Sequence, residues 1–167
     1  MQIGTYAFSN TYISSITFPS SLTFSDYTVA YCSKLKEIVL PDDLTSIPPY
    51  FAYMCTNLNS VEAKGATVIQ KRAFQFCINL ETVKFSTVTA FQEYCFSYCS
   101  KLRMQFDEKV PVTFEEHSFE FCDSLSFDSV PSTWSFSGSY NFLGCNGLTS
   151  LKIAKSPALI LSKAVVD

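Results

Sequence analysis

The chain has 167 residues, of which 47% are hydrophobic and 16% are charged, and its formal net charge is −3. Such a chain is too apolar to remain disordered and is long enough to bury one core. The negative charge argues against a nucleic-acid partner, which is usually bound through a basic field. No run of about 18 apolar residues is present, so no membrane span is predicted.

Cysteine spacing shows an internal repeat. Six of the seven cysteines recur at intervals of 22 or 23 residues, at Cys32, Cys55, Cys77, Cys99, Cys122 and Cys145. Leucine follows each of them by three residues, at Leu35, Leu58, Leu80, Leu102, Leu125 and Leu148. Apolar residues precede the cysteines by eight positions, at Phe24, Ile47, Ile69, Phe91 and Phe114, with Ser137 as the exception. Others precede them by three, at Val29, Ala52, Phe74, Phe96, Phe119 and Phe142. A unit this short must bury its apolar face against its neighbours, which predicts a solenoid.

The repeats can be placed along the chain. The first begins near Ile3 and carries Thr11 in the cysteine column, and the others begin near residues 24, 47, 69, 91, 114 and 137. A partial repeat begins at residue 160. We therefore expect a single solenoid domain over residues 1–167, with about seven repeats of 21–23 residues.

Each repeat is predicted to contain one short strand after its leucine. In the second repeat Ile38 and Leu40 should point inward and Glu37 and Val39 outward, and Pro41 should end the strand. Stacked over the repeats, these segments predict one parallel sheet along the solenoid. The fifth and sixth repeats match less well, because their apolar pairs arrive one residue early, at Met104/Phe106 and Phe127/Val130.

The rest of each repeat is predicted to turn the chain back. In the second repeat the pair Leu44 and Ile47 should reverse its direction. Segments such as Ala73-Phe74 should then close the coil as a short turn or a single helical turn. The phenylalanine column should stack from coil to coil and fill the side opposite the sheet.

The pattern Cys-x-x-Leu-x-x-Ile-x-Leu-Pro in Cys32–Pro41, followed by Leu44–Ile47 and by Ala73-Phe74 before Cys77, resembles the BspA-like, or Treponema-pallidum-type, leucine-rich repeats. The resemblance covers residues 3 to about 165 and implies a β-rich, right-handed leucine-rich-repeat solenoid. It also implies a surface or secreted protein of a mucosal bacterium or protist that attaches to host proteins, matrix or other cells. The cytoplasm is the alternative location, because Met1–Gly4 shows no basic region followed by an apolar stretch.

The cysteine column has two main interpretations. Stacked coils would place neighbouring Cα atoms roughly 5 Å apart, within disulfide range. The side chains would run parallel, however, so a bridge would be strained, and Thr11 in the same column indicates a small, buried, weakly polar group. Free structural thiols are therefore favoured over some bridge. Metal binding is less favoured still, since zinc sites draw on close pairs and only Cys95 and Cys99 form one.

His117 is the only histidine, and a serine–histidine–acid set could in principle be assembled around it. It lies between the apolar columns of Phe114 and Phe119, which favours a solvated histidine in a connecting turn. The sequence predicts no catalytic, metal-binding or cofactor-binding residues, no cofactor and no enzymatic activity.

Trp134 and Tyr140 lie in the irregular stretch that joins the sixth and seventh repeats. Aromatic residues beside serine and glycine could mark a contact loop. They could equally fill a gap that the imperfect repeat leaves, and we favour this second interpretation.

The predicted binding surface is the outward face of the sheet, because solenoids commonly bind partners on such extended surfaces. Its residues are Glu37, Val39, Ser60, Glu62, Thr82, Lys84, Arg103 and Gln105. Hydroxyls with charges of both signs suit a protein or glycan, such as a host surface or matrix protein. The alternative is a solvated face without a partner.

A second predicted contact is an unfinished apolar edge near the C-terminus. Its residues are Leu159, Ile160, Leu161, Val165 and Val166. Exposed edges favour pairing, so we expect a homodimer or end-to-end association, or else that the chain is an excerpt from a longer array. The leading hypothesis is a non-catalytic protein-interaction or adhesion module, and the alternative is a self-assembling structural unit of a surface coat or matrix.

Overall fold

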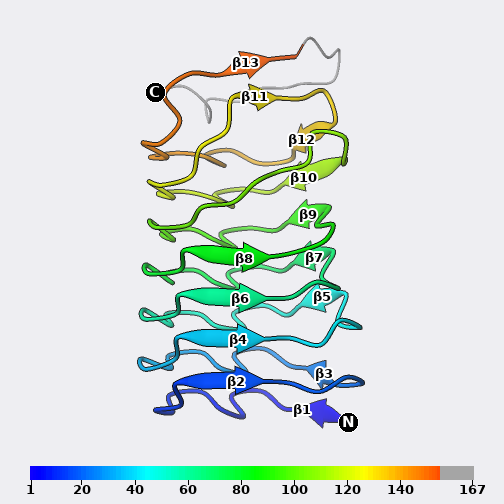
Figure 1. The fold of residues 1–167 in the computed structure, drawn as a ribbon, viewed down its shortest axis with the longest axis vertical. Coiled ribbons are helices and arrows are strands. Elements are labelled where there is room, and N and C mark those ends of the chain that lie inside the picture. Colours follow the sequence, from blue (N-terminus) through cyan, green and yellow to red (C-terminus); the bar gives the residue numbers. More distant parts are fainter. Residues whose placement is uncertain (155–167) are drawn as a thin grey trace.

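The computed structural model describes residues 1–154, which wind into a right-handed solenoid of about seven coils (Figure 1). The solenoid fold and its repeat are confirmed. The partial repeat from residue 160 lies outside the described residues, as does the proposed edge at Leu159, Ile160, Leu161, Val165 and Val166. Among residues 1–154 there is no helix that is long and apolar enough to cross a membrane.

The predicted sheet is present over four coils. We call it the first sheet, and its parallel strands are β2 (Ser15–Thr17), β4 (Glu37–Val39), β6 (Ser60–Glu62) and β8 (Thr82–Lys84). Register places Ile16, Ile38, Val61 and Val83 opposite one another. Of these, Ile38 and Val61 are fully buried, so the inward column follows from the period-two alternation of a strand.

A further sheet, not expected from the sequence, forms on another side of the coil. This second sheet consists of β5 (Ser46–Ile47), β7 (Val68–Ile69), β9 (Ala90–Phe91), β10 (Val112–Phe114) and β12 (Trp134–Phe136). Two separate parallel pairs are β1 (Gln2–Ile3) with β3 (Thr23–Phe24), and β11 (Ser129–Val130) with β13 (Lys152–Ile153). The prediction of a single sheet was therefore incomplete.

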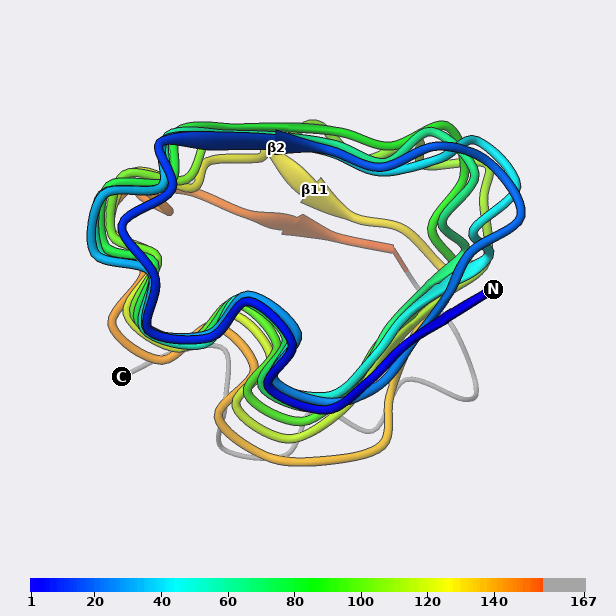
Figure 2. The same ribbon diagram turned by 90° about the horizontal axis from the view of Figure 1, so that it is seen from below.

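Viewed along its axis, the coil has three sides (Figure 2). Two carry the sheets, and the third, which we call the turn side, carries the turns between each second-sheet strand and the next first-sheet strand. Register also explains the exception at Ser137, because Phe136, not Ser137, pairs with Phe114 in the apolar column.

The turns are not helical, which corrects one of the two forms expected for them. Each contains two residues with positive φ, four positions apart, such as Tyr27 (57°) and Tyr31 (59°). Helix formation requires consecutive residues with negative φ, so this geometry interrupts it. In these pairs only Gly144 (φ 71°) is a glycine, and the other positions hold side chains that disfavour a left-handed backbone.

The cysteine column forms a ladder of hydrogen bonds between coils. Each thiol donates to a carbonyl of the preceding coil, for example Cys55 Sγ to Val29 O (3.0 Å) and Cys99 Sγ to Phe74 O (3.1 Å). All seven cysteines are buried and free, which confirms the preference for structural thiols over bridges. The thiols of the column therefore satisfy backbone oxygens of the preceding coil.

The phenylalanine column is also confirmed. Phe74, Phe96, Phe119 and Phe142 stack in series with centroids 5.2, 5.3 and 5.7 Å apart. Their interplanar angles do not exceed 23°, and Phe74, Phe96 and Phe119 are fully buried.

The variant Phe96→Ala should therefore lower the free energy of unfolding by about 3–5 kcal/mol, through lost apolar contact and the cavity left between Phe74 and Phe119. Urea unfolding midpoints measure this. The matched control is Tyr12→Ala, since Tyr12 is 81% exposed and should change little. Equal midpoints for the two variants would contradict the stacked column.

Burial raises the pKa of the Cys99 and Cys122 thiols well above the ordinary value. At pH 8 these groups should stay protonated, and their alkylation in the native protein should be far slower than in urea. Mass spectrometry after timed iodoacetamide exposure measures the rates residue by residue. Unreduced protein in urea should show seven reactive thiols, and a lower count would show a bridge.

Candidate binding surfaces

The first sheet brings six of the eight predicted surface residues together in two rows. Register aligns Glu37, Ser60 and Thr82 in one row and Val39, Glu62 and Lys84 in the other. The residues in a row come from successive coils, so strand spacing sets them roughly 5 Å apart. Glu37, Thr82 and Lys84 are exposed, and the other three are half-buried.

The rows carry balanced charge. Glu62 lies 2.6 Å from Lys64 Nζ and 3.4 Å from Lys84 Nζ, and the hydrogen bond from Lys64 is the main cause that lowers the pKa of Glu62. The Lys84 side chain remains 70% exposed. Its charge is therefore available to a partner, because a solvated ion pair of this kind is weak.

Arg103 and Gln105 lie beyond the end of this sheet. Arg103 makes a single β-bridge to Thr82, and the fifth coil contributes no strand to the first sheet. The cause is the one-residue shift at Met104/Phe106, since side chains alternate along a strand and a one-residue slip would turn the apolar pair outward. Met104 is buried, and the segment around it does not form a first-sheet strand.

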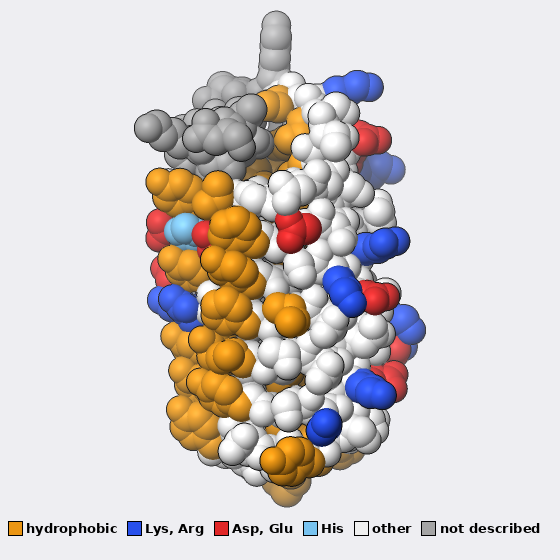
Figure 3. Space-filling view, turned by 90° about the vertical axis from the view of Figure 1, so that its left-hand side faces the viewer, with side chains coloured by type: hydrophobic (Ala, Val, Ile, Leu, Met, Phe, Trp, Pro, Cys, Tyr) orange, Lys and Arg blue, Asp and Glu red, His pale blue; other side chains and the backbone are white. Residues whose placement is uncertain are grey.

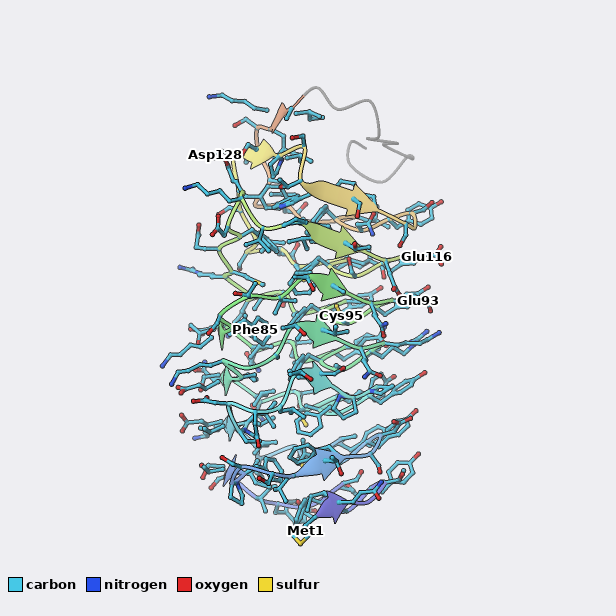
Figure 4. The ribbon with its side chains drawn as sticks, turned by 90° about the vertical axis from the view of Figure 1, so that its right-hand side faces the viewer. Met1, Phe85, Glu93, Cys95, Glu116 and Asp128 are labelled. Atoms are coloured by element: carbon cyan, nitrogen blue, oxygen red, sulfur yellow. The ribbon has the colours of Figure 1, made fainter. Side chains whose placement is uncertain are left out.

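Loss of the strand leaves an open depression, which we call the hollow. One part, about 290 Å³, is lined by Gln105, Phe106, Glu108, Ser126, Phe127, Asp128, Ser129 and Trp134. The adjoining part, about 270 Å³, shares Gln105 and Ser126 and adds Arg103, Met104 and Ser124. Figure 4 shows Asp128 on the same side of the solenoid as Phe85, with Glu93 and Glu116 on the opposite side.

Trp134 forms the inner wall of the hollow and packs into the core, as we favoured from the sequence, whereas Tyr140 is 40% exposed and stacks on His117 instead. Trp134 is 3% exposed, and its ring centroid lies 5.1 Å from Phe106 and 5.2 Å from Phe127. Within residues 1–154 its indole Nε1–H has no hydrogen-bond partner. A buried donor without an acceptor is unfavourable by about 1–3 kcal/mol.

The turn side carries an aromatic band that the sequence analysis did not single out. Tyr6, Tyr27 and Tyr50 stack with centroids 4.7 and 4.5 Å apart, and Tyr94, His117 and Tyr140 continue the same column at 4.6 and 5.0 Å. A second column contains Tyr31, Tyr53, Phe76, Tyr98 and Phe121. Figure 3 shows the band as a stripe along the solenoid with the histidine within it.

The band could have been found from residue spacing. Tyrosine stands five residues before the cysteine column, or Thr11, in five of seven repeats, and Arg72 and His117 occupy the other two. Arg72 completes the column through a cation–π contact, with Cζ 4.3 Å from the Tyr94 centroid. Because the rings stack on one another, they present mainly edges and hydroxyls to solvent.

His117 lies in a turn, as predicted, but it is not solvated. Its side chain is 16% exposed, is stacked between Tyr94 and Tyr140, and places Nδ1 3.2 Å from Glu120 Oε1. Ser97 Oγ donates to the other oxygen of Glu120. The carboxylate thus lies between the serine and the histidine, whereas a nucleophilic triad needs the imidazole in the middle.

Acidic side chains do not converge on a metal site. Among residues 1–154 no group of three or more His, Cys, Asp or Glu side chains is placed to hold a metal ion. Glu93, Glu115 and Glu116 line a shallow depression with Ser137–Ser139 on the opposite side from the hollow.

Comparison with known proteins gives a consistent result. The profile of the BspA type leucine rich repeat region matches residues 1–103 and 104–165, in six copies. No curated protein matches the sequence.

Two solved structures share the fold. A leucine-rich repeat protein from Bacteroides ovatus superposes with a TM-score of 0.77 at 23% identity, over 92% of this chain and 45% of that one. A leucine rich cell surface protein from Faecalibacterium prausnitzii gives 0.56 at 21% identity, over 84% of this chain and 48% of that one. The chain thus spans just under half the length of either protein.

The band also predicts an alkaline pH dependence. Burial, followed by the charges of Tyr50 and Tyr6, raises the pKa of Tyr27 to about 12 from an ordinary value of 10.0. A raised pKa favours the protonated phenol in the folded state, so its stabilising contribution is complete below pH 10 and is lost as the pH rises to about 12. Tyr27→Phe should therefore lose less stability than wild type across this window.

Urea midpoints for both proteins between pH 9 and about 12 measure the difference. The control is Tyr12→Phe, because Tyr12 is 81% exposed and should leave the profile unchanged. Parallel profiles for wild type and Tyr27→Phe would contradict the stacked arrangement.

Proposed function

Because this chain belongs to the BspA-type leucine-rich repeat family, we propose that it is a non-catalytic adhesion module whose first sheet presents a polar surface to a protein or glycan. The observation that carries this proposal is the register of the first sheet. It repeats exposed hydroxyls and charges in straight rows over four coils, which gives a partner regularly spaced polar groups.

The chemistry of the rows supports such a partner. Glu37 and Glu62 are balanced by Lys84 and Arg103, so a polyanion gains little from this face. Hydrogen bonding from Ser60 and Thr82 suits amide or hydroxyl groups. We propose a protein or glycan of a host surface or matrix as the partner class.

Display at a cell surface is part of the same proposal. It is supported by the likeness to the cell surface protein from Faecalibacterium prausnitzii, which this chain matches over 48% of that protein's length. The non-catalytic assignment is supported by the contacts of Ser97, Glu120 and His117, which do not place the imidazole against a nucleophile.

The test is a variant that removes three exposed side chains from the rows, Glu37→Ala/Thr82→Ala/Lys84→Ala. Wild-type protein on beads should capture a defined set of proteins from epithelial-cell and matrix extracts. The triple variant should capture at least about 10-fold less of these proteins, since two charged contacts and one hydrogen bond are removed.

The matched control removes the same residue types from the other sides, Glu116→Ala/Thr89→Ala/Lys71→Ala. It should capture the same proteins as wild type at the same level. An equal loss of capture in both triple variants, or no loss in the first, would contradict the assignment of binding to the first sheet.

A further inference from the structure

We infer that the hollow at the end of the first sheet is a binding site for a neutral saccharide. This inference refines the proposed function and rests on it, because the hollow continues the same face of the solenoid. It adds a defined pocket, a ligand class and the residues that would select it.

The first step is the origin of the hollow. The strand ladder stops at the Thr82–Arg103 bridge, and pairing on this side resumes only between β11 and β13. Figure 2 shows β11 set inside the outline of the first sheet, so the surface is recessed there. The recess follows from the one-residue shifts of Met104 and Phe106 in the fifth repeat and of Phe127 in the sixth.

The second step is size. The two parts, about 290 and 270 Å³, share Gln105 and Ser126 in their linings and are therefore adjacent. Pockets for small molecules measure about 300–1,000 Å³. Each part of the hollow is just below that range and the two together reach it, which suits a ligand of one or two sugar rings.

The third step is an unsatisfied donor. Phe106 and Phe127 pack edge-on against Trp134 and fix its ring. Trp134 lines the hollow, and its buried indole N–H has no acceptor among the described residues. A ligand oxygen that reached this N–H would satisfy it, whereas an apolar ligand would leave it unpaired.

The fourth step is the polar rim. Arg103 and Gln105 can donate hydrogen bonds, and Glu108 and Asp128 can only accept them when ionised. A ligand must therefore donate and accept within a short distance, and a sugar hydroxyl does both. With one positive and two negative side chains in the lining, the hollow disfavours anionic sugars.

The half-buried rings of Phe106 and Phe127 add an apolar surface beside this rim. A pyranose presents both C–H groups and hydroxyls, so it matches the mixture of aromatic and polar lining better than a peptide amide does.

Binding can be measured directly, because Trp134 is the only tryptophan in the chain and its fluorescence reports on the hollow. The probes are tetrasaccharides of glucose, mannose, galactose and N-acetylglucosamine, with a sialylated tetrasaccharide and an uncharged extended octapeptide for comparison. At least one neutral tetrasaccharide should change the emission saturably, and the other two probes should bind at least about 10-fold more weakly.

The variant Gln105→Ala/Asp128→Ala removes two exposed groups from the rim and should weaken neutral tetrasaccharide binding about 10-fold or more. Trp134→Phe keeps an aromatic ring and removes the N–H, and calorimetry should show a similar loss. Urea midpoints close to wild type establish that both variants are folded. A variant with a lowered midpoint is replaced by Gln105→Ala alone, for which the same loss is expected.

The control is Glu116→Ala/Thr89→Ala/Lys71→Ala, whose residues lie outside both the rows and the hollow, and it should bind the sugar as wild type does. Sugar binding by none of the neutral probes, preference for the sialylated probe or the peptide, or full binding by the rim variant would overturn the inference. Protein capture that persists in the row variant would contradict only the proposed use of the rows, so the two failures are distinguishable.

Discussion

The hydrogen bond from each thiol of the cysteine column to a carbonyl of the preceding coil illustrates the constraint on which the fold depends. A coil of about 22 residues cannot cover its own apolar side chains or satisfy its own backbone, so the next coil must do both. At Phe74 the two requirements meet, because its ring stacks on Phe96, its N–H donates to Cys95 O and its carbonyl accepts the Cys99 thiol. Register between coils is therefore fixed at many points at once.

Register also determines the surfaces. Any outward position that recurs in every repeat becomes a straight row, whether it holds the polar groups of the first sheet or the tyrosines of the turn side. The hollow has the opposite origin, since it forms where two repeats depart from the pattern by one residue. Regular repeats thus give extended surfaces, and an irregular repeat gives a local pocket.

Much of the fold could be predicted from sequence, because Cys77, Leu80 and Val83 show both the repeat and the inward face of a strand. The second sheet could not, since strands such as Val68–Ile69 have two residues and show no alternation. The aromatic band could have been predicted from the tyrosines five residues before the cysteine column, but the left-handed backbone beneath it could not, since that conformation is unexpected for tyrosine. Six of the eight predicted surface residues lie together on the first sheet. The hollow beside Arg103 and Gln105 could not be predicted, because it depends on the course of the backbone where the strand is missing.

The left-handed turn residues have a consequence for how the solenoid folds. Each coil holds a pair of positive-φ positions, and thirteen of the fourteen are filled by residues other than glycine. Such a conformation is unfavourable by about 1–3 kcal/mol per residue, so an isolated coil is strongly disfavoured and only contact with its neighbours compensates. Nucleation must therefore involve at least two adjacent coils, because the strain of each coil is offset only where it contacts a neighbour.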